Sequence, residues 1–158
     1  KPGRECAHNV NYWGFGDYLG IGAGAHAKVS LPDRIVREVR FKQPRQYVAG
    51  VAAGDAVMER REIARDEVGF EFMLNALRLT AGVPASLFAE RTGHPLALVA
   101  SRLADGVRRG LIDADPTRIV ATETGQRFLN TTLEMFLPAA AREAPVGDAP
   151  VAVVEAPR

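Results

Sequence analysis

The sequence is poor in cysteine, with Cys6 alone among 158 residues, and it lacks any long hydrophobic run. One cysteine cannot form an intramolecular disulfide or a multi-cysteine metal site, and such usage is typical of a reducing cytoplasm. The apolar runs are broken by Gly, Arg or Asp, which excludes a transmembrane helix. The chain begins with Lys1 and has neither an initiating Met nor an apolar signal region. We therefore expect a segment of a longer cytoplasmic protein.

An excess of charge of one sign is also missing, since twenty basic and nineteen acidic side chains leave a net charge of +1. This balance excludes a generally polycationic nucleic-acid binder. Hydrophobic residues make up 47% and charged residues 25% of the chain, which is ordinary for a folded domain. The charge is distributed unevenly, with +4 over residues 1–65 and −2 over residues 66–138.

Changes in composition and periodicity divide the chain into four segments: 1–30, 31–65, 66–138 and 139–158. The first is rich in Gly, aromatic and polar residues, and we expect a buried strand over residues 18–21. The second contains Pro32, Pro44 and Gly50 and is interpreted as a connector with a strand over residues 34–41. The last is rich in Ala, Pro and Glu, has no periodicity and is predicted to be disordered.

The third segment carries helical periodicity. Its predicted elements, in order, are helices over 66–79, 84–91 and 96–109, strands at 111–112 and 118–121, and a helix from Thr122, its N-cap, to about residue 137. This order is typical of a winged-helix unit. We expect residues 66–137 to form the only autonomous core, with these side chains pointing inward: Phe70, Leu74, Leu77, Leu103, Val107, Leu129 and Phe136.

A winged helix suggests DNA binding through residues 96–109, where Arg102, Arg108 and Arg109 can meet phosphate. The segment is net acidic, contains no lysine and has Asp105 among those arginines. Phosphate contacts supply most of the non-specific affinity for DNA and need a basic surface. We therefore favour a structural or partner-binding module and expect no nucleic-acid partner.

Gly20, Gly22 and Ala25 match a relaxed dinucleotide-binding fingerprint. That site requires a helix directly after the glycines to receive the pyrophosphate, whereas residues 28–33 do not open an amphipathic helix. We therefore prefer a glycine-rich strand end that packs closely against a ligand or another strand.

The three histidines are candidate metal ligands, although His94 is assigned to an exposed loop because it precedes Pro95. His8 and His26 flank the glycine-rich segment, and either alone is more often a hydrogen-bonded structural histidine. Cys6 lies two residues before His8, but two ligands do not make a structural zinc site. Heme iron needs only one or two axial ligands and a flat apolar pocket, whose walls can come from nearby aromatic residues: Tyr12, Trp13, Phe15 and Tyr18.

Several strings in the sequence resemble one family. They are Lys1-Pro2-Gly3, His8-Asn9-Val10-Asn11-Tyr12-Trp13, Asp17-Tyr18-Leu19-Gly20-Ile21-Gly22-Ala23-Gly24-Ala25-His26, Phe70-Glu71-Phe72-Met73-Leu74-Asn75 and Thr124-Gly125-Gln126-Arg127-Phe128-Leu129-Asn130. The family is that of the bacterial heme chaperones of the radical-SAM superfamily, which are similar to oxygen-independent coproporphyrinogen III oxidases. The resemblance covers residues 1–138 and is most specific in the second and third strings.

The resemblance implies an α+β fold in which residues 1–30 end a radical-SAM partial barrel and a helical, winged-helix-like C-terminal domain follows. Members of the family carry a 4Fe–4S cluster on a Cys-x3-Cys-x2-Cys motif, with S-adenosylmethionine on the open iron. This chain has no such motif, so we expect it to bind no cluster and not to act as a radical-SAM enzyme by itself.

The resemblance also implies a heme site around the second string. Its residues here are His8, Asn9, Asn11, Tyr12 and Trp13, with His8 as the suspected ligand of the heme iron. The third string supplies residues expected near a cofactor: Gly20, Ile21, Gly22, Gly24 and His26. Arginines near the site are candidate partners of the heme propionates through forked hydrogen bonds, namely Arg4, Arg37 and Arg40.

The function implied by the resemblance is that of a chaperone that binds heme and transfers it to apo-hemoproteins. Membrane respiratory proteins are the expected acceptors, and through them the protein is expected to associate peripherally with the inner membrane. One alternative is the coproporphyrinogen III oxidase of heme biosynthesis, and another is a winged-helix DNA binder. Heme absorbance, porphyrinogen turnover and salt-dependent DNA affinity distinguish the three.

Overall fold

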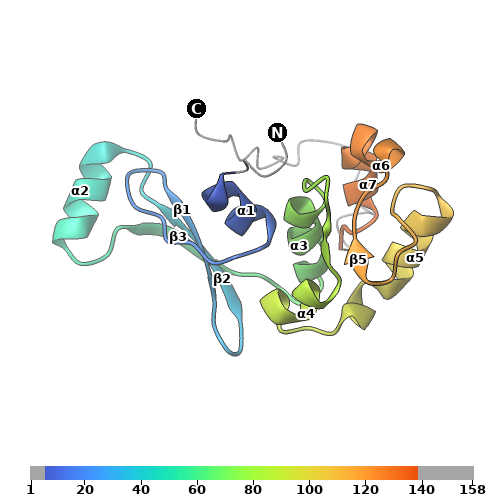
Figure 1. The fold of residues 1–158 in the computed structure, drawn as a ribbon. Coiled ribbons are helices and arrows are strands. Elements are labelled where there is room, and N and C mark those ends of the chain that lie inside the picture. Colours follow the sequence, from blue (N-terminus) through green and yellow to red (C-terminus); the bar gives the residue numbers. More distant parts are fainter. Residues whose placement is uncertain (1–5, 139–158) are drawn as a thin grey trace.

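A computed structural model of the chain describes residues 6–138 and has the expected α+β composition (Figure 1). A three-stranded sheet lies on one side, a group of short helices lies on the other, and helix α1 (Ala7–Trp13) lies between them. None of the described helices is long and apolar enough to cross a membrane. Residues 1–5 and 139–158 lie outside the described residues, and with them the tail predicted to be disordered.

The sheet is antiparallel and has the order β1-β2-β3. Strand β1 (His26–Ser30) and strand β2 (Ile35–Arg40) form a hairpin, and β2 then pairs with β3 (Val57–Glu62). Helix α2 (Pro44–Ala52) connects β2 to β3, and Pro44 suits its first turn because proline has no N–H to donate there. Strand β2 corresponds to the strand predicted over 34–41, so the segment interpreted as a connector contributes most of a sheet.

The predicted buried strand over residues 18–21 is wrong. Only Tyr18 pairs with the sheet, through an isolated bridge to Lys28, while Leu19 and Ile21 are 75% and 87% exposed. The reason is the path of the chain, which turns back on itself to enter β1. Gly20 lies so close to the backbone of His26 that a Cβ there would be 2.5 Å from the His26 carbonyl oxygen, and Gly22 has φ +110°.

The helical group contains these elements: α3 (Val68–Ala76), β4 (Val83–Pro84), α4 (Ser86–Thr92), the 3-10 helix η1 (Leu96–Leu98), α5 (Ala100–Arg108), β5 (Arg118–Ile119), α6 (Glu123–Arg127) and α7 (Leu129–Glu134). The predicted N-cap is confirmed, because the Thr122 hydroxyl accepts a hydrogen bond from the Gly125 N–H at 3.0 Å. The predicted last helix is divided in two by Phe128, whose φ of −112° and ψ of 45° leave the helical region.

Two of the predicted helices are shorter than expected. The first spans Val68–Ala76 rather than 66–79, and the third begins as the 3-10 turn before Val99. The strand predicted at 111–112 contributes one bridge, between Ile112 and Ala121. Strand β5 pairs antiparallel with β4, an arrangement that joins residues far apart in the sequence.

The predicted core residues are partly correct. Leu77 and Phe136 are fully buried, while four others are partly buried against the core: Phe70, Leu74, Leu103 and Leu129. Val107 is 36% exposed, so its assignment to the core is wrong. Helix α3 also buries Phe72 and Met73 completely, because it is covered on more than one side and a single stripe of apolar positions does not describe it.

The hydrophobic core extends beyond the helical group. Phe15, Ile35 of β2 and Ile63 belong to the same buried cluster as Phe72 and Phe136. The rings of Phe15 and Phe72 meet edge-on, with their centroids 5.7 Å apart. The expectation that residues 66–137 form the only core is therefore wrong, since the sheet, the segment after α1 and the helices share one.

A buried lysine fixes the segment between α1 and the sheet. Lys28 is 1% exposed, and its Nζ donates to Asp17 Oδ1 at 2.8 Å and to Ser30 Oγ at 3.0 Å. The same Nζ lies 4.1 Å from the centre of the Phe15 ring, a cation–π contact. Burial lowers the pKa of Lys28, and Asp17 opposes that effect. These contacts hold Phe15 in place despite its φ of +56°, which is unfavourable for a residue with a side chain.

We expect Phe72→Ala to lower the free energy of unfolding by about 3–5 kcal/mol, because the substitution removes a fully buried ring shared by both parts of the core. Val107→Ala, at an exposed position, should cost less than about 1 kcal/mol. Denaturant unfolding of the two variants measures both values. Equal losses would contradict this description of the core.

The Asp17–Lys28 contact should make the free energy of unfolding depend on pH in the acidic range. Burial alone would raise the pKa of Asp17, but hydrogen bonds from Lys28 and Ser30 outweigh it and lower that pKa. A carboxyl of this kind stabilises the fold above its unfolded pKa of about 3.9, and its contribution is lost as the pH falls through the lower folded pKa.

We therefore expect Asp17→Asn to be less stable than the wild type by about 1–2 kcal/mol at neutral pH, a value reduced because Asp17 is half exposed. The difference should shrink as the pH falls below about 4. Asp33→Asn is the matched control, because Asp33 pairs with Arg34 on the surface. A difference between Asp17→Asn and wild type that is independent of pH, or equal to that of Asp33→Asn, would contradict the prediction.

Candidate functional site

The suspected iron ligand lies on helix α1, between the sheet and α3 (Figure 1). His8 is in the first turn and is exposed, and Tyr12 is one turn later on the same face. Their ring centroids are 5.0 Å apart with the planes tilted by 56°. Within residues 6–138 the His8 side chain makes no hydrogen bond. Its imidazole nitrogens are therefore accessible to a ligand approaching from solvent.

Tyr12 is held by a second tyrosine. Its ring stacks on that of Tyr18, with the centroids 3.9 Å apart and the planes 27° apart. Burial raises the pKa of Tyr12, and the neighbouring Tyr18 raises it further. The phenol of Tyr12 is therefore neutral at physiological pH, and its ring presents an uncharged flat surface beside His8.

Behind this pair lies an arginine of β2. Arg37 Nη1 donates to the Tyr18 hydroxyl at 3.1 Å, and Arg37 Nη2 donates to Glu71 Oε2 of α3 at 2.5 Å. Burial alone would lower the pKa of Arg37, but Glu71 and Tyr18 outweigh it and raise that pKa. Arg61 of β3 also reaches Glu71, at 3.2 Å. The carboxylate therefore holds two arginines from adjacent strands.

The structure contradicts the expectation that Arg37 and Arg40 are available for heme propionates. The guanidinium of Arg37 is already paired with Glu71. Arg40 donates to the carbonyl of Gly20 at 3.2 Å and lies 3.6 Å from Glu38. Arg4, the third candidate, lies outside the described residues.

The other residues of the motif divide between the surface and the turn after α1. Asn11 donates from Nδ2 to the carbonyl of Asp17 at 3.0 Å, and its side chain fills the space beside Gly16, where a Cβ would meet it at 1.9 Å. Asn11 therefore stabilises the turn rather than facing the His8–Tyr12 side. Asn9 and Trp13 are both half-buried.

The glycine-rich segment forms a turn held by backbone contacts. The Gly22 N–H donates to the Tyr47 hydroxyl of α2 at 3.0 Å, and the Gly24 N–H donates to the carbonyl of Phe41 at 2.9 Å. Ile21 and His26 are exposed on its surface. Among the described residues, the His26 side chain makes no ring contact or hydrogen bond with α1. The structure therefore does not bring the two candidate histidines together.

The described residues do not fit a metal cluster. No group of three His, Cys, Asp or Glu side chains gathers anywhere within residues 6–138. Cys6 is exposed and unpaired there. An iron–sulfur cluster needs three or four thiolates, so this donor set does not fit one. A heme needs one axial ligand and a flat surface, and an imidazole beside an aromatic ring, such as His8 beside Tyr12, is a donor set of that kind.

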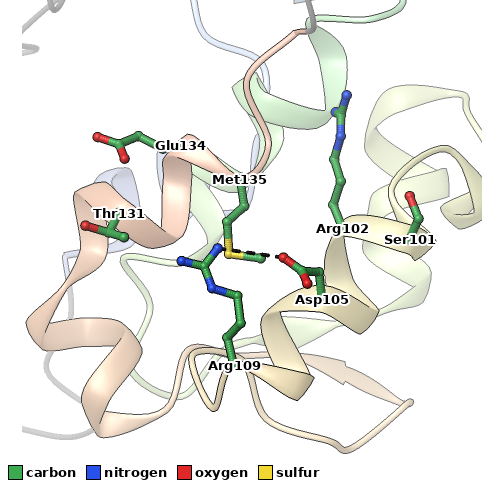
Figure 2. A pocket seen from close by; sticks show the side chains of 7 residues that line it. All are labelled: Ser101, Arg102, Asp105, Arg109, Thr131, Glu134 and Met135. Carbon is green, nitrogen blue, oxygen red and sulfur yellow. Dashed lines mark ion pairs between the residues drawn. The ribbon is translucent and has the colours of Figure 1, made fainter. Parts of the chain in front are cut away.

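A separate hollow of about 440 Å³ lies between α5 and α7 (Figure 2). Asp105 and Arg109 form an ion pair across 3.7 Å at its lower edge, and Arg108 donates to the same carboxylate at 2.9 Å. Arg102 donates to the carbonyl of Phe136 at 3.1 Å. The three arginines considered for phosphate contacts thus each have a partner within the protein.

Comparison with known proteins agrees with the sequence motifs. Residues 63–128 match the family described as HemN C-terminal domain. Three heme chaperones named HemW align over 138–139 residues and 87% of this chain, with identities of 38% for Escherichia coli K12, 36% for Haemophilus influenzae and 33% for Bacillus subtilis. The aligned part covers 35–36% of these relatives, so the chain spans about a third of their length.

A solved structure with a similar fold is the coproporphyrinogen III oxidase HemN of Escherichia coli, described as a radical SAM enzyme. The TM-score is 0.51 at 21% identity, with 77% of this chain and 28% of that one covered, which shows a likeness of fold. The chain is therefore similar over 87% of its length to proteins named heme chaperone, and residues 63–128 match the HemN C-terminal domain.

Proposed function

We propose that the chain is the C-terminal part of a heme chaperone and that His8 is its axial ligand to the heme iron. The observation that carries this proposal is the state of His8, whose imidazole is exposed and makes no hydrogen bond within the described residues. Meanwhile its helix is fixed through Tyr12 and Phe15. The cargo is heme, and its acceptors are cytoplasmic or membrane-associated apo-hemoproteins, including respiratory proteins.

The chemistry of the site suits a ligand that is held and then released. Neutral imidazole is a good axial ligand to heme iron, and the Tyr12 ring offers a flat surface for one side of a porphyrin. Asn9 and Trp13 lie on the same short helix and complete the proposed site, while Asn11, also on that helix, supports it through its hydrogen bond to the turn. An open site leaves the other face of the heme accessible to an acceptor.

The cofactors of the complete protein belong elsewhere in its sequence. We propose that cysteines outside this chain hold a 4Fe–4S cluster, with S-adenosylmethionine on its open iron. We also propose that the glycine-rich turn, with Gly20, Ile21, Gly22, Gly24 and His26, lies near these cofactors through its exposed residues Ile21 and His26. With Cys6 as its only cysteine, this chain has no radical-SAM activity by itself.

We propose that the helical group has the shape of a winged helix. The order α3, β4, α4, α5 and β5 supports this assignment, as does the antiparallel pairing of β4 with β5. Arg108 and Arg109 pair with Asp105 at the end of α5, and residues 66–138 carry a net charge of −2. We propose that this domain positions other parts of the protein and does not bind DNA.

In the complete protein, His8→Ala should lower heme occupancy and change the Soret spectrum, because the iron loses its imidazole ligand. Cluster content, measured as iron and sulfide, should not change. His94→Ala is the matched control, since His94 lies in the loop between α4 and η1, which carries no residue of the proposed site. If His8→Ala binds heme with the affinity and spectrum of the wild type, His8 is not the ligand.

The winged-helix region should bind duplex DNA only weakly at physiological salt, because residues 66–138 carry a net charge of −2. Fluorescence anisotropy over a salt series measures this affinity. A tight complex whose affinity falls steeply with salt would overturn the assignment. Arg108→Ala and Arg109→Ala would then identify the contacts.

A further inference from the structure

We propose that Tyr18 and Arg37 are positioning residues for the heme site, and that Glu71 of the HemN C-terminal domain holds them in place. This inference rests on the proposed role of His8 as the iron ligand. It gives the C-terminal domain a part in heme binding, although none of its residues in this arrangement would touch the heme.

The first argument comes from the weakness of α1 itself. A helix of seven residues is unstable in isolation, and α1 has no fully buried residue and no side-chain N-cap hydrogen bond. Its orientation must therefore come from tertiary contacts. Phe15 holds the end of the helix against Phe72, and Tyr12 is the contact nearest to His8.

The second argument is a continuous series of contacts that leads away from His8. Tyr12 lies 5.0 Å from His8, and Tyr18 stacks on Tyr12 at 3.9 Å between centroids. Arg37 then donates to the Tyr18 hydroxyl at 3.1 Å. Because Tyr18 is bound at its hydroxyl and stacked on its face, its ring cannot turn away from Tyr12. Tyr12 in turn limits the positions open to the imidazole.

The third argument is the strength of the ion pair at the end of this series. The side chains of Arg37 and Glu71 are 24% and 12% exposed, so their contact is shielded from solvent. The pair between Arg60 and Glu38 in the same sheet differs, because Arg60 is 64% exposed. Shielded pairs hold geometry more firmly than exposed pairs, which contribute little. Glu71 therefore determines where Arg37, and through it Tyr18, can lie.

The test uses the complete protein loaded with heme and measures the rate at which heme passes to an excess of apo-globin. Tyr18→Leu removes the stacked ring, and we expect it to raise this rate about 3- to 10-fold, the range that corresponds to one aromatic pair. Tyr18→Phe keeps the ring but loses the hydrogen bond from Arg37, so it should also raise the rate, by less than Tyr18→Leu does. Arg60→Met is the matched control and should leave the rate unchanged.

A double-mutant cycle separates positioning from a general loss of structure. In a His8→Ala background, Tyr18→Leu should have no further effect on heme release, because Tyr18 acts through His8. An equal effect in both backgrounds would overturn the proposal, as would a Tyr18→Leu protein that releases heme as slowly as the wild type. The thermal unfolding of the apo-protein, followed in parallel, should remain cooperative for Tyr18→Leu, which shows that the variant is folded while its rate of heme release is measured.

The failure of this inference differs from the failure of the proposed ligand. If His8→Ala retains wild-type heme binding, the proposed function of His8 is wrong, whatever Tyr18→Leu does. If heme occupancy falls in His8→Ala while Tyr18→Leu releases heme at the wild-type rate, His8 is still the ligand and the positioning role of Tyr18 is wrong. Glu71→Gln provides a further check, since it weakens the ion pair without touching either tyrosine and should act in the same direction as Tyr18→Leu.

Discussion

The ion pair between Arg37 and Glu71 is the contact on which the arrangement of the site depends. It joins strand β2 to helix α3, and it also fixes Tyr18, which supports the helix that carries His8. The shared hydrophobic core also stabilises this region between the sheet and α3, where Phe15 packs against Phe72. Sheet and helices therefore form one body at the position of α1. A short helix that is weak by itself can then hold an exposed imidazole in a defined place.

Such an arrangement suits a protein that must hold heme and also give it up. A fully enclosed heme would bind more tightly but would leave no face open to an acceptor. With His8 as the proposed ligand, an exposed imidazole on a fixed helix would place the iron where a second protein can reach it. The lysine beneath this helix serves the same purpose, because Lys28 binds Asp17 and contacts the Phe15 ring. Because an unpaired buried charge would be costly, these contacts favour one path of the chain between α1 and β1.

Local sequence signals predicted the elements that depend on neighbouring residues. Thr122 was recognisable as an N-cap, and helical spacing identified Leu77 and Phe136 as buried. Spacing failed for Val107, which lies near the end of α5 and faces solvent, and for Phe72, because α3 is covered on more than one side. The strand expected over residues 18–21 did not form, since apolar side chains there point outward where Gly20 packs on backbone.

The candidate site also combines residues that the sequence pattern predicts with residues that only the tertiary structure brings together. His8 and Tyr12 are four residues apart, so a helix brings them together and the motif alone suggested both. Arg37 and Glu71 are separated by 34 residues, and their pairing arises only when the sheet meets α3.

The most direct test of the account is pulsed electron paramagnetic resonance of ferric heme bound to the complete protein labelled with 15N-histidine. We expect imidazole nitrogen coupling that disappears in His8→Ala; coupling that persists in that variant would contradict the account.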